Sequence, residues 1–477
     1  MGSGGRLQWA AVSVSVVLLA VWYRQPADRL DAVLESLLRA ERLTAAPEIT
    51  ADRPAPRVAV GYGGCMDLFA RALSVLDDGQ CQVRPAHHGF LKDRRQLQQT
   101  FLYFFQHGAA AERYISDGSL FAELVALARK APDARYEVGG NAPVMAARFA
   151  REGCSVLLGS GRYAGQHVPE RVEVVGPQTP QPDIHLILEY AANTHWCRQA
   201  TTRANRFIIH SDVANPTLSA LEDFGEALKK FDPDMLVVSG LQMMDNFPFK
   251  EGARRQRLEL LRQQLVSQQS RTKIHFEMAS FTDTQLLTEM LELVTPYVDS
   301  MGMNEQELPN LQSMLLYGNV SLVSDANPRV AGVLDQMRDV MRALGDVEPD
   351  AGSGRRPLTR LHVHTLAFQA IMTRRDSIWK NSMSAAARAS LTAHRHICGT
   401  KQVDTRKARL IMDDSFSVSS EPGSRRVPFD PSRPVSCWTE GQYEMCVAPV
   451  LVCTEVYQTA GGGDNISSAG LVPQILG

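Results

Sequence analysis

The stretch TAGGGDNISSAG, residues 459–470, places three consecutive glycines directly before an acidic side chain, Asp464. Glycines let the backbone approach an anion without interference from a Cβ atom. The segment after Asp464 has helical character, so its free N–H groups and the positive end of its dipole would face the same point. A phosphoryl group held there could be attacked by a hydroxyl whose proton Asp464 accepts. The pattern therefore favours a phosphate site with a base beside it.

A simpler interpretation of the same stretch is a tight turn over the three glycines, with Asp464 as the cap of the helix that follows. A nucleotide-binding P-loop is excluded, because no Lys-Ser/Thr pair follows the glycines. Taken alone, the stretch leaves the phosphate site and the capped turn both open.

Further carboxylates follow two other predicted strands. Glu277 ends the apolar run KIHFE, and Glu307 closes the motif NEQE, which begins at Asn304. Hard oxygen ligands, often acting through water, are what Mg²⁺ prefers. A helix start rich in glutamate looks the same, so NEQE alone leaves a metal site and a helix start both open.

Short apolar runs bounded by Gly, Asp or Pro predict the buried strands that must hold these side chains. The runs begin near residues 58, 154, 184, 206, 235, 273, 358 and 448. Apolar residues three and four apart predict helices over 254–268, 283–298, 332–344 and 377–394. This alternation predicts an α/β fold with a largely parallel sheet covered by helices, in which ligands bind beyond the carboxyl ends of the strands.

The region from about residue 80 to residue 200 has a less regular pattern. It mixes helices with strand-like pieces and a Pro-rich loop, VPERVEVVGPQTPQPD. A smaller second domain or lid is expected there. The loops at 345–357 and 416–434 are rich in Gly, Pro, Ser and Arg, which predicts exposed segments.

The composition is that of a globular protein: 477 residues, 44% hydrophobic and 21% charged, with a formal net charge of -2. Such a charge gives no field that would attract nucleic acid, so no nucleic-acid partner is expected. The eight cysteines are too scattered for a disulfide scaffold in a chain of this length.

The N-terminus has a different character. Arg6 precedes the apolar run 9–23, and Arg24 follows it. The run is short for a membrane span and suits a signal peptide or an uncleaved signal anchor over residues 1–24. A hydrophobic terminal helix of the soluble domain is the alternative. We then expect a linker over 25–55, a catalytic domain over 56–477, and a place in the secretory pathway: the endoplasmic reticulum lumen, its membrane, or the secreted fraction. There a disulfide such as Cys437–Cys446 becomes possible.

Longer stretches of the chain resemble one family. Gly-x-Gly-Asp near the C-terminus with Asn-x-x-Glu upstream resembles the ribokinase-like superfamily. Within it the chain is similar to the ADP-dependent sugar kinases, and most closely to their animal glucokinase branch. The resemblance runs in colinear order over roughly residues 55–477 and rests on GAAAERYISD (108–117), VGGNAPVMA (138–146), HLILEY (185–190), ANRFIIHSD (204–212), LVVSGLQMM (236–244), GMNEQEL (302–308), TRLHVHTL (359–366) and PVLVC (449–453).

The resemblance implies a ribokinase-like, doubly wound α/β domain with a smaller α/β lid that closes over a sugar. It implies transfer of the β-phosphoryl group of ADP to the 6-hydroxyl of D-glucose, which gives AMP and D-glucose 6-phosphate and opens glycolysis. Mg²⁺ is the implied cofactor, ADP and D-glucose are the implied partners, and a monomer is expected.

The resemblance also assigns roles to residues of this chain. Asp464 matches the catalytic base, and the anion hole matches Gly461, Gly462 and Gly463. Magnesium-binding carboxylates match Glu277, Glu307 and Asp464. Nucleotide-binding positions match Arg206, Asn304 and His364. Sugar-binding positions match Asp67, Glu112, Gly140, Asn141 and His185. A guanidinium fork suits the phosphate role of Arg206, and carboxylates and amides suit sugar hydroxyls. The simpler interpretations are a surface arginine for Arg206 and a satisfied core histidine for His185.

Two departures from the family pattern affect these expectations. In GYGGCMD the chain has Gly63 where the family has asparagine, so one amide contact to the sugar is expected to be missing. The chain also ends soon after NISSAGLVPQIL, so a shortened C-terminal helix is expected. Phosphoryl transfer needs positioning and electrostatic stabilisation from any donor, so the physics alone does not choose ADP over ATP. An ATP-dependent ribokinase-like sugar kinase and an inactive, membrane-tethered sugar-binding protein are therefore the alternatives.

Overall fold

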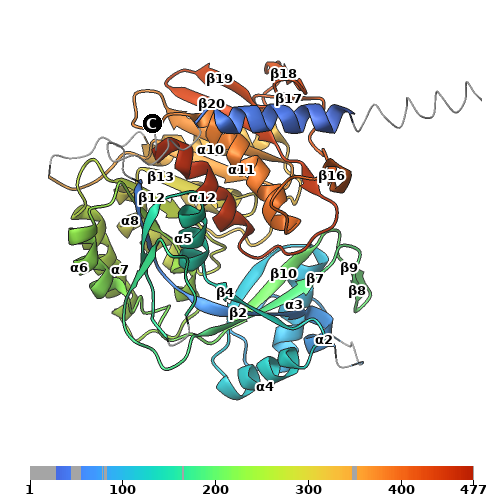
Figure 1. Cartoon of the computed structure of the whole chain (residues 1–477). Helices are drawn as coiled ribbons and strands as arrows, with labels where there is room; N and C mark the ends of the chain where they lie inside the picture. Colours follow the sequence, from blue (N-terminus) through green and yellow to red (C-terminus); the bar gives the residue numbers. More distant parts are fainter. Residues whose placement is uncertain are drawn as a thin grey trace, which may run out of the picture.

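The computed structural model describes residues 28–44, 55–77, 79, 83–163, 166–345 and 352–475, and two sheets dominate the fold (Figure 1). The larger sheet runs in the order β6-β5-β1-β11-β12-β13-β14-β15-β20-β19. Its strands are β1 (Arg57–Gly61), β5 (Ser155–Gly159), β6 (Val172–Val175), β11 (Met235–Val238), β12 (Lys273–Glu277), β13 (Ser300–Asn304), β14 (Arg360–His364), β15 (Phe368–Arg374), β19 (Ser436–Glu440) and β20 (Tyr443–Pro449). The strands from β6 to β14 are parallel, and β15, β20 and β19 extend the sheet in antiparallel pairing.

Helices cover both faces of this sheet, as the doubly wound interpretation requires (Figure 1). Side chains alternate between the faces along each strand. Ala59 and Val238 pack in the core with α6 (Leu221–Phe231), α7 (Ala253–Val266), α8 (Thr284–Leu293), α9 (Glu307–Tyr317) and α10 (Val330–Gly345). Val60 and Val237 pack on the opposite side with α5 (Asn141–Arg151) and α12 (Gly462–Ile475). Both faces are therefore apolar, which is why the strands read as continuous hydrophobic runs.

The smaller sheet has the order β3-β10-β7-β2-β4 and lies at the bottom of Figure 1. Its strands are β2 (Cys65–Arg71), β3 (Ala111–Tyr114), β4 (Arg135–Gly139), β7 (Ile184–Tyr190) and β10 (Asn205–His210). Its apolar face packs against α2 (Ala72–Leu76), α3 (Arg94–Gln106) and α4 (Gly118–Arg129). The lid is thus wider than the expected range of about 80 to 200, and α5, β5 and β6 inside that range belong to the larger unit. The chain crosses between the two sheets several times, so strands that are neighbours in a sheet are often far apart in the sequence.

Two predicted elements end earlier than expected, and a proline lies at or shortly after each end. The helix predicted over 283–298 is α8, which ends at Leu293, and a short 3₁₀ turn containing Pro296 follows. The strand predicted from residue 448 is broken: β20 ends at Pro449, and β21 (Val452–Cys453) pairs instead with β16 (Ala408–Arg409). Proline has no N–H to donate to a ladder. The helix predicted over 377–394 is α11 (Ser382–Ile397).

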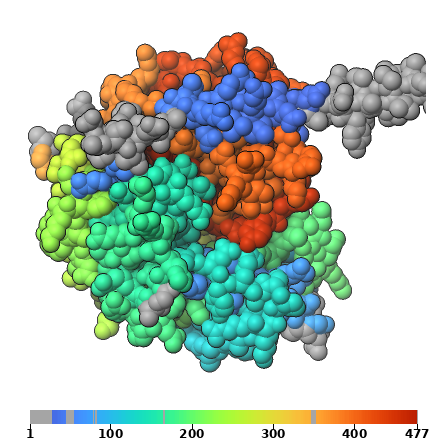
Figure 2. Space-filling view, in the orientation of Figure 1, coloured from blue at the N-terminus to red at the C-terminus, as the bar shows by residue number. Residues whose placement is uncertain are grey.

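The expected linker over 25–55 is wrong in part, because residues 28–42 form a helix that docks on the catalytic domain. Val33 and Leu37 are fully buried in one core with α11 and β20. Their three- to four-residue spacing with Leu30 and Leu34 gives the helix an apolar stripe. Figure 2 shows this helix in blue across the orange surface of the C-terminal part. The signal segment expected over 1–24 lies outside the described residues. Within the described ranges, no helix has both the length and the apolar content needed to span a bilayer.

Two disulfides brace the C-terminal part. Cys437–Cys446, which the sequence left possible, joins β19 and β20 at directly paired positions. Cys398–Cys453 joins the end of α11 to β21. These bonds fix the strands and the helix that lie beside one end of the cavity described next.

Candidate active site

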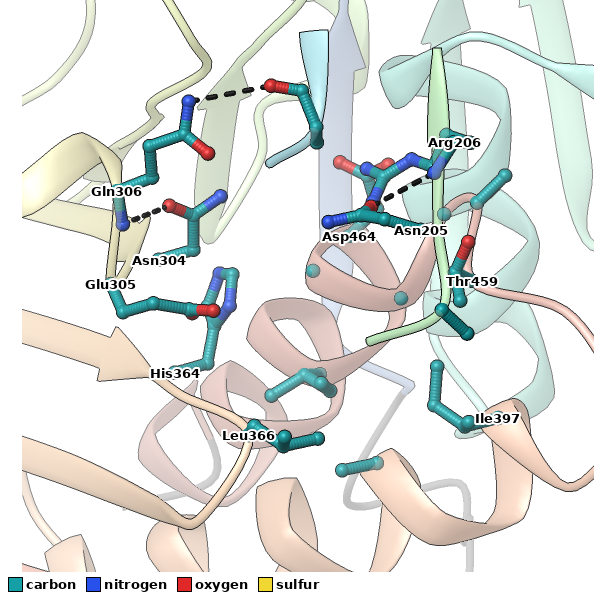
Figure 3. Close-up of a pocket in the computed structure, with 18 of the residues that line it drawn as sticks. Asn205, Arg206, Asn304, Glu305, Gln306, His364, Leu366, Ile397, Thr459 and Asp464 are labelled. Atoms are coloured by element: carbon teal, nitrogen blue, oxygen red, sulfur yellow. Dashed lines mark hydrogen bonds between the residues drawn. The ribbon is translucent and has the colours of Figure 1, made fainter. Parts of the chain in front are cut away.

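One cavity of about 540 Å³ lies between the two sheets, where the parallel strands of the larger sheet end. All the residues that the resemblance assigned a role line it. The smaller sheet and the start of α5 contribute Asp67, Glu112, Gly140, Asn141, His185 and Arg206. The larger unit contributes Glu277, Asn304, Glu307, His364 and the turn of Gly461, Gly462, Gly463 and Asp464. Figure 3 shows Asp464, Arg206, Asn304 and His364 around the open space.

The glycine turn opens directly into α12. Gly461 has a φ of +66°, in the region that favours glycine, and the helix begins at Gly462. The first N–H groups of a helix have no partner within it, and here they meet the cavity. Gly463 has a packing reason as well, because a Cβ there would lie 2.8 Å from His364 Cε1. The turn therefore has the form of an anion site.

Asp464 lies inside the first turn of α12, which begins at Gly462, so it does not occupy the capping position that the simpler interpretation gave it. Its Oδ1 instead accepts a hydrogen bond from Asn141 Nδ2 at 2.9 Å. Burial above all, and then the nearby charge of Glu277, raise the pKa of Asp464 to about 6 against the opposing effects of Asn141 and Arg206. The carboxylate is mostly ionised at neutral pH, with a pKa suited to a general base.

Glu277, at the end of β12, is held as a carboxylate. Its oxygens accept hydrogen bonds from Ser467 Oγ at 2.8 Å and His275 Nε2 at 2.9 Å, and His364 Nε2 lies 3.5 Å away. Burial alone would raise the pKa of Glu277, but the hydrogen bonds from the two histidines overcome it and lower the pKa to about 2. A permanently charged carboxylate therefore faces the cavity.

Asn304 and Glu307 form a reciprocal pair at the start of α9. Glu307 N donates to Asn304 Oδ1 at 2.9 Å, and Asn304 N donates to Glu307 Oε2 at 2.9 Å. This is a capping box, so the helix-start interpretation of NEQE is correct at the level of local structure. Both side chains also line the cavity. Burial above all raises the pKa of Glu307 to about 7, with a smaller contribution from the charge of Glu277.

A divalent cation fits this group of carboxylates. The charge of Glu277 raises the pKa of both Asp464 and Glu307, so the three repel one another, and a cation between them would relieve that repulsion. Among the described residues, their oxygens do not converge as a tight three-ligand set. Ligation through water, as Mg²⁺ often uses, suits that spacing.

Arg206 projects from β10 toward Asp464 (Figure 3). Its guanidinium donates to Asn205 Oδ1 at 3.2 Å, and its buried Nε has no hydrogen-bond partner among the described residues. A donor left unpaired in a buried site favours an external anion. The preceding loop is tied across the cavity, because Arg203 donates to Glu305 Oε1 at 2.9 Å. The sequence did not point to Arg203, which is only a second arginine in a polar loop.

The five expected sugar residues lie together on the lid side. Asp67 and His185 occupy paired positions of the parallel strands β2 and β7. His185 Nε2 lies 2.7 Å from Asp212 Oδ2, and its Nδ1 lies 3.7 Å from Glu112 Oε1. Burial opposes the charged form of His185, but Asp212 above all raises its pKa to about 10. His185 is therefore a buried cation among carboxylates, which no pattern in the sequence indicated.

Two polar partners of this group were not expected. Asp212 is fully buried, and Gln242 Nε2 donates to Asn141 Oδ1 at 2.6 Å. Asn141 thus links Gln242 to Asp464 in one chain of hydrogen bonds. The signals were present in ANRFIIHSD and LVVSGLQMM, where a polar residue follows the end of a buried strand.

Gly63 stands where an amide contact to the sugar was expected to be missing. It has a φ of +77°, and a Cβ there would face Asn215 Oδ1 at 3.7 Å. Among the described residues, position 63 does not line the cavity. Asn215 holds the neighbouring turn instead, because its Oδ1 accepts from Gly64 N at 3.1 Å and its Nδ2 donates to Asp212 at 2.5 Å.

Comparison with known proteins identifies the family of the chain. A family model described as "ADP-specific Phosphofructokinase/Glucokinase conserved region" matches residues 56–473. The chain belongs to this family. It is 34% identical to the ADP-dependent glucokinase of Bos taurus over 98% of its own length and 93% of the relative. It is 28% identical to a probable ADP-dependent glucokinase of Caenorhabditis elegans, over 87% of its own length and 84% of the relative.

The ribokinase-like fold is shared with solved ADP-dependent kinases. A kinase in complex with fructose-6-phosphate and ADPbetaS superposes with a TM-score of 0.66 at 15% identity, over 94% of this chain and 97% of that one. A reconstructed ancestor of the ADP-dependent phosphofructokinases of Methanosarcinales superposes with a TM-score of 0.56 over 96% and 98% of the two chains. The chain therefore shares its overall fold with these ADP-dependent kinases.

Proposed function

We propose that the protein transfers the β-phosphoryl group of ADP to the 6-hydroxyl of D-glucose and releases AMP and D-glucose 6-phosphate. The observation that carries the proposal is the meeting, in one cavity, of a buried carboxylate at a helix N-terminus with a cluster of polar groups on the smaller sheet. The family contains both glucokinases and phosphofructokinases, and the relatives most similar in sequence are named as glucokinases.

The lid side would bind the sugar. Asp67 and Glu112 offer acceptor oxygens to hydroxyl groups, and His185 offers a charged donor held in place by Asp212. Asn141 contacts Asp464 directly, so a sugar held against Asn141 would present its reacting hydroxyl to the base. Asp464 would accept the 6-hydroxyl proton as the oxygen attacks phosphorus. This chain of contacts couples sugar binding to the position of the base.

The glycine turn and Arg206 would stabilise the phosphoryl group. Backbone N–H groups at the start of α12 donate to its oxygens, and the unpaired Nε of Arg206 would complete a charged hydrogen bond. Mg²⁺, held by Glu277, Glu307 and Asp464 through water, would supply further charge stabilisation when bound. The chemistry then depends on positioning and electrostatics, as phosphoryl transfer generally does.

The other end of the cavity would bind the adenine base. Leu366, Ile397 and Val450 line the cavity with apolar atoms. Figure 3 shows Leu366 and Ile397 on one side of the open space, with His364 and Asn304 also beside it. A flat aromatic base favours such a surface. The nucleotide would therefore lie along the cavity with its last phosphate at the glycine turn.

A coupled assay for glucose 6-phosphate tests the proposal. Purified protein with glucose and Mg²⁺ should form AMP and glucose 6-phosphate from ADP, lose activity in EDTA and regain it when Mg²⁺ is restored. More product from ATP than from equimolar ADP, with adenylate kinase excluded, would favour an ATP-dependent sugar kinase instead. No turnover with either donor, together with glucose binding, would favour the inactive binding protein. The charged Glu277 and the buried Asp464 argue against that last outcome.

The cellular setting of this activity is the secretory pathway in our proposal, with the enzyme luminal, anchored by its N-terminal segment, or secreted. The apolar run at 9–23 supports it, and the Cys437–Cys446 bond suits an oxidising compartment. A monomer is expected because one chain supplies all the site residues named above. Protease protection of microsomes tests the topology, and light scattering of the purified protein tests the monomer.

A further inference from the structure

We propose that Arg148 is a positioning residue that acts through Asn465 to hold the glycine turn in the geometry needed for phosphoryl transfer. The inference rests on the proposed function, because it concerns the same turn. Arg148 lies on α5 and does not line the cavity itself. Its role follows from an unbroken series of hydrogen bonds that ends at the first residue of the turn.

Asn465 makes two hydrogen bonds to the carbonyl oxygen of Gly461. Its side-chain Nδ2 donates to Gly461 O at 2.9 Å, and its backbone N donates to the same oxygen at 3.1 Å. Gly461 is the residue whose positive φ turns the chain into α12, so the position of its peptide sets the direction of the N–H groups that follow. Asn465 is only 5% exposed and is next to Asp464 in the chain. Movement of its amide would therefore move both the turn and the base.

Arg148 determines which way that amide faces. Its Nε donates to Asn465 Oδ1 at 3.0 Å. An arginine side chain has donors only, so it can accept no bond from the amide nitrogen. The oxygen of Asn465 must then face Arg148, and the nitrogen must face Gly461. A neutral side chain that both donates and accepts would leave the two orientations open.

Arg148 is itself fixed by a part-buried series of charges. Glu152 lies 3.5 Å from Arg148 and 3.3 Å from Arg388. Arg388 and Arg395 both contact Glu41 of the N-terminal helix, and Arg395 does so in a bidentate pair at 2.8 and 3.2 Å. Alternating charges of this kind rigidify the side chains they connect. The guanidinium of Arg148 is thus a fixed support for the amide.

The helix α5 meets the catalytic turn at two points. Asn141, its first residue, donates to Asp464, and Arg148, two turns later on the same face, donates to Asn465. The two acceptors are adjacent in the chain. One rigid helix therefore aligns the base and the anion hole with each other, which is the relation that phosphoryl transfer depends on most.

The test compares Arg148→Met with Arg151→Met, a matched control one turn away on α5 with an exposed side chain. We expect Arg148→Met to lower kcat by roughly 10- to 100-fold, because misplacement by about 1 Å can cost 100-fold. The KM for glucose should change by less than about threefold, because the sugar contacts are on the lid. The control should keep wild-type kinetics. Unchanged kcat in Arg148→Met, or an equal loss in the control, would overturn the inference.

A double-mutant cycle separates positioning from general stability. Asn465→Ala should lower kcat by a similar factor, and the double variant with Arg148→Met should be no worse than Asn465→Ala alone. Additive losses would show that Arg148 does not act through Asn465. If Arg148→Met does not fold, Arg148→Gln replaces it in the cycle, since a neutral side chain that both donates and accepts leaves both orientations of the Asn465 amide open. Wild-type turnover is measured first: its absence defeats the proposed function, whereas failure in the variants alone defeats the positioning role.

Discussion

Replacement of Asp464 by asparagine removes the proton acceptor and keeps the size and polarity of the side chain. An asparagine oxygen could still accept the bond that Asn141 Nδ2 now makes at 2.9 Å, so the local fold should persist. General-base catalysis is typically worth about 10²- to 10⁴-fold, or roughly 3–5.5 kcal/mol of barrier. We expect kcat to fall by that factor. ADP affinity should not fall, because backbone N–H groups hold the anion.

The assay is the coupled formation of glucose 6-phosphate at about pH 8, well above the pKa of Asp464 at about 6, with ADP binding followed by calorimetry. Asp117→Asn is the matched control. Asp117 is a true N-cap, since its Oδ1 accepts from Ser119 N at 2.9 Å and Leu120 N at 3.1 Å. Asparagine caps as well as aspartate, so that variant should keep its activity. If Asp464→Asn retained more than about a tenth of wild-type turnover, the assignment of the base would be refuted.

Further outcomes are expected at other positions. Gly463→Ala should lower kcat by about tenfold or more, because the new Cβ would displace His364, and wild-type kinetics in this variant would contradict the anion-hole geometry. If the protein passes through the secretory pathway, mass spectrometry should find a glycan on exposed Asn319, and a glycan on buried Asn465 in active enzyme would contradict the site. Folding raises the pKa of His185 to about 10, so the charged form of His185 stabilises the fold. That stabilisation is fully present below the unfolded pKa of about 6.5 and is lost as the pH rises toward about 10. Urea titrations should therefore show that the difference in unfolding free energy between wild type and His185→Gln becomes smaller as the pH rises through this range. A difference that does not change with pH would show that the charge on His185 is not formed.

Most secondary structure could be predicted from local sequence. The runs that became β11, β12 and β14 are apolar because both of their faces are covered, and the spacing in α7 and α10 follows one buried face. The helix over 28–42 was missed although its apolar stripe is present, because the polar residues between the stripe positions resemble those of a linker. Local patterns also did not indicate which strands belong to the smaller sheet and which to the larger one.

The site could likewise be predicted from the sequence only in part. The sequence by itself determined the glycine turn, its acidic neighbour and the residue types of the carboxylates, because the chemistry of a side chain is fixed by its identity. Only the tertiary structure decided the surroundings of Asp464, since its hydrogen-bond partner Asn141 is 323 residues away in the sequence. It also placed Asp212 against His185 and Arg148 against Asn465. Contacts between such distant positions arise when the two sheets and the helix α5 come together, and no local pattern encodes that meeting.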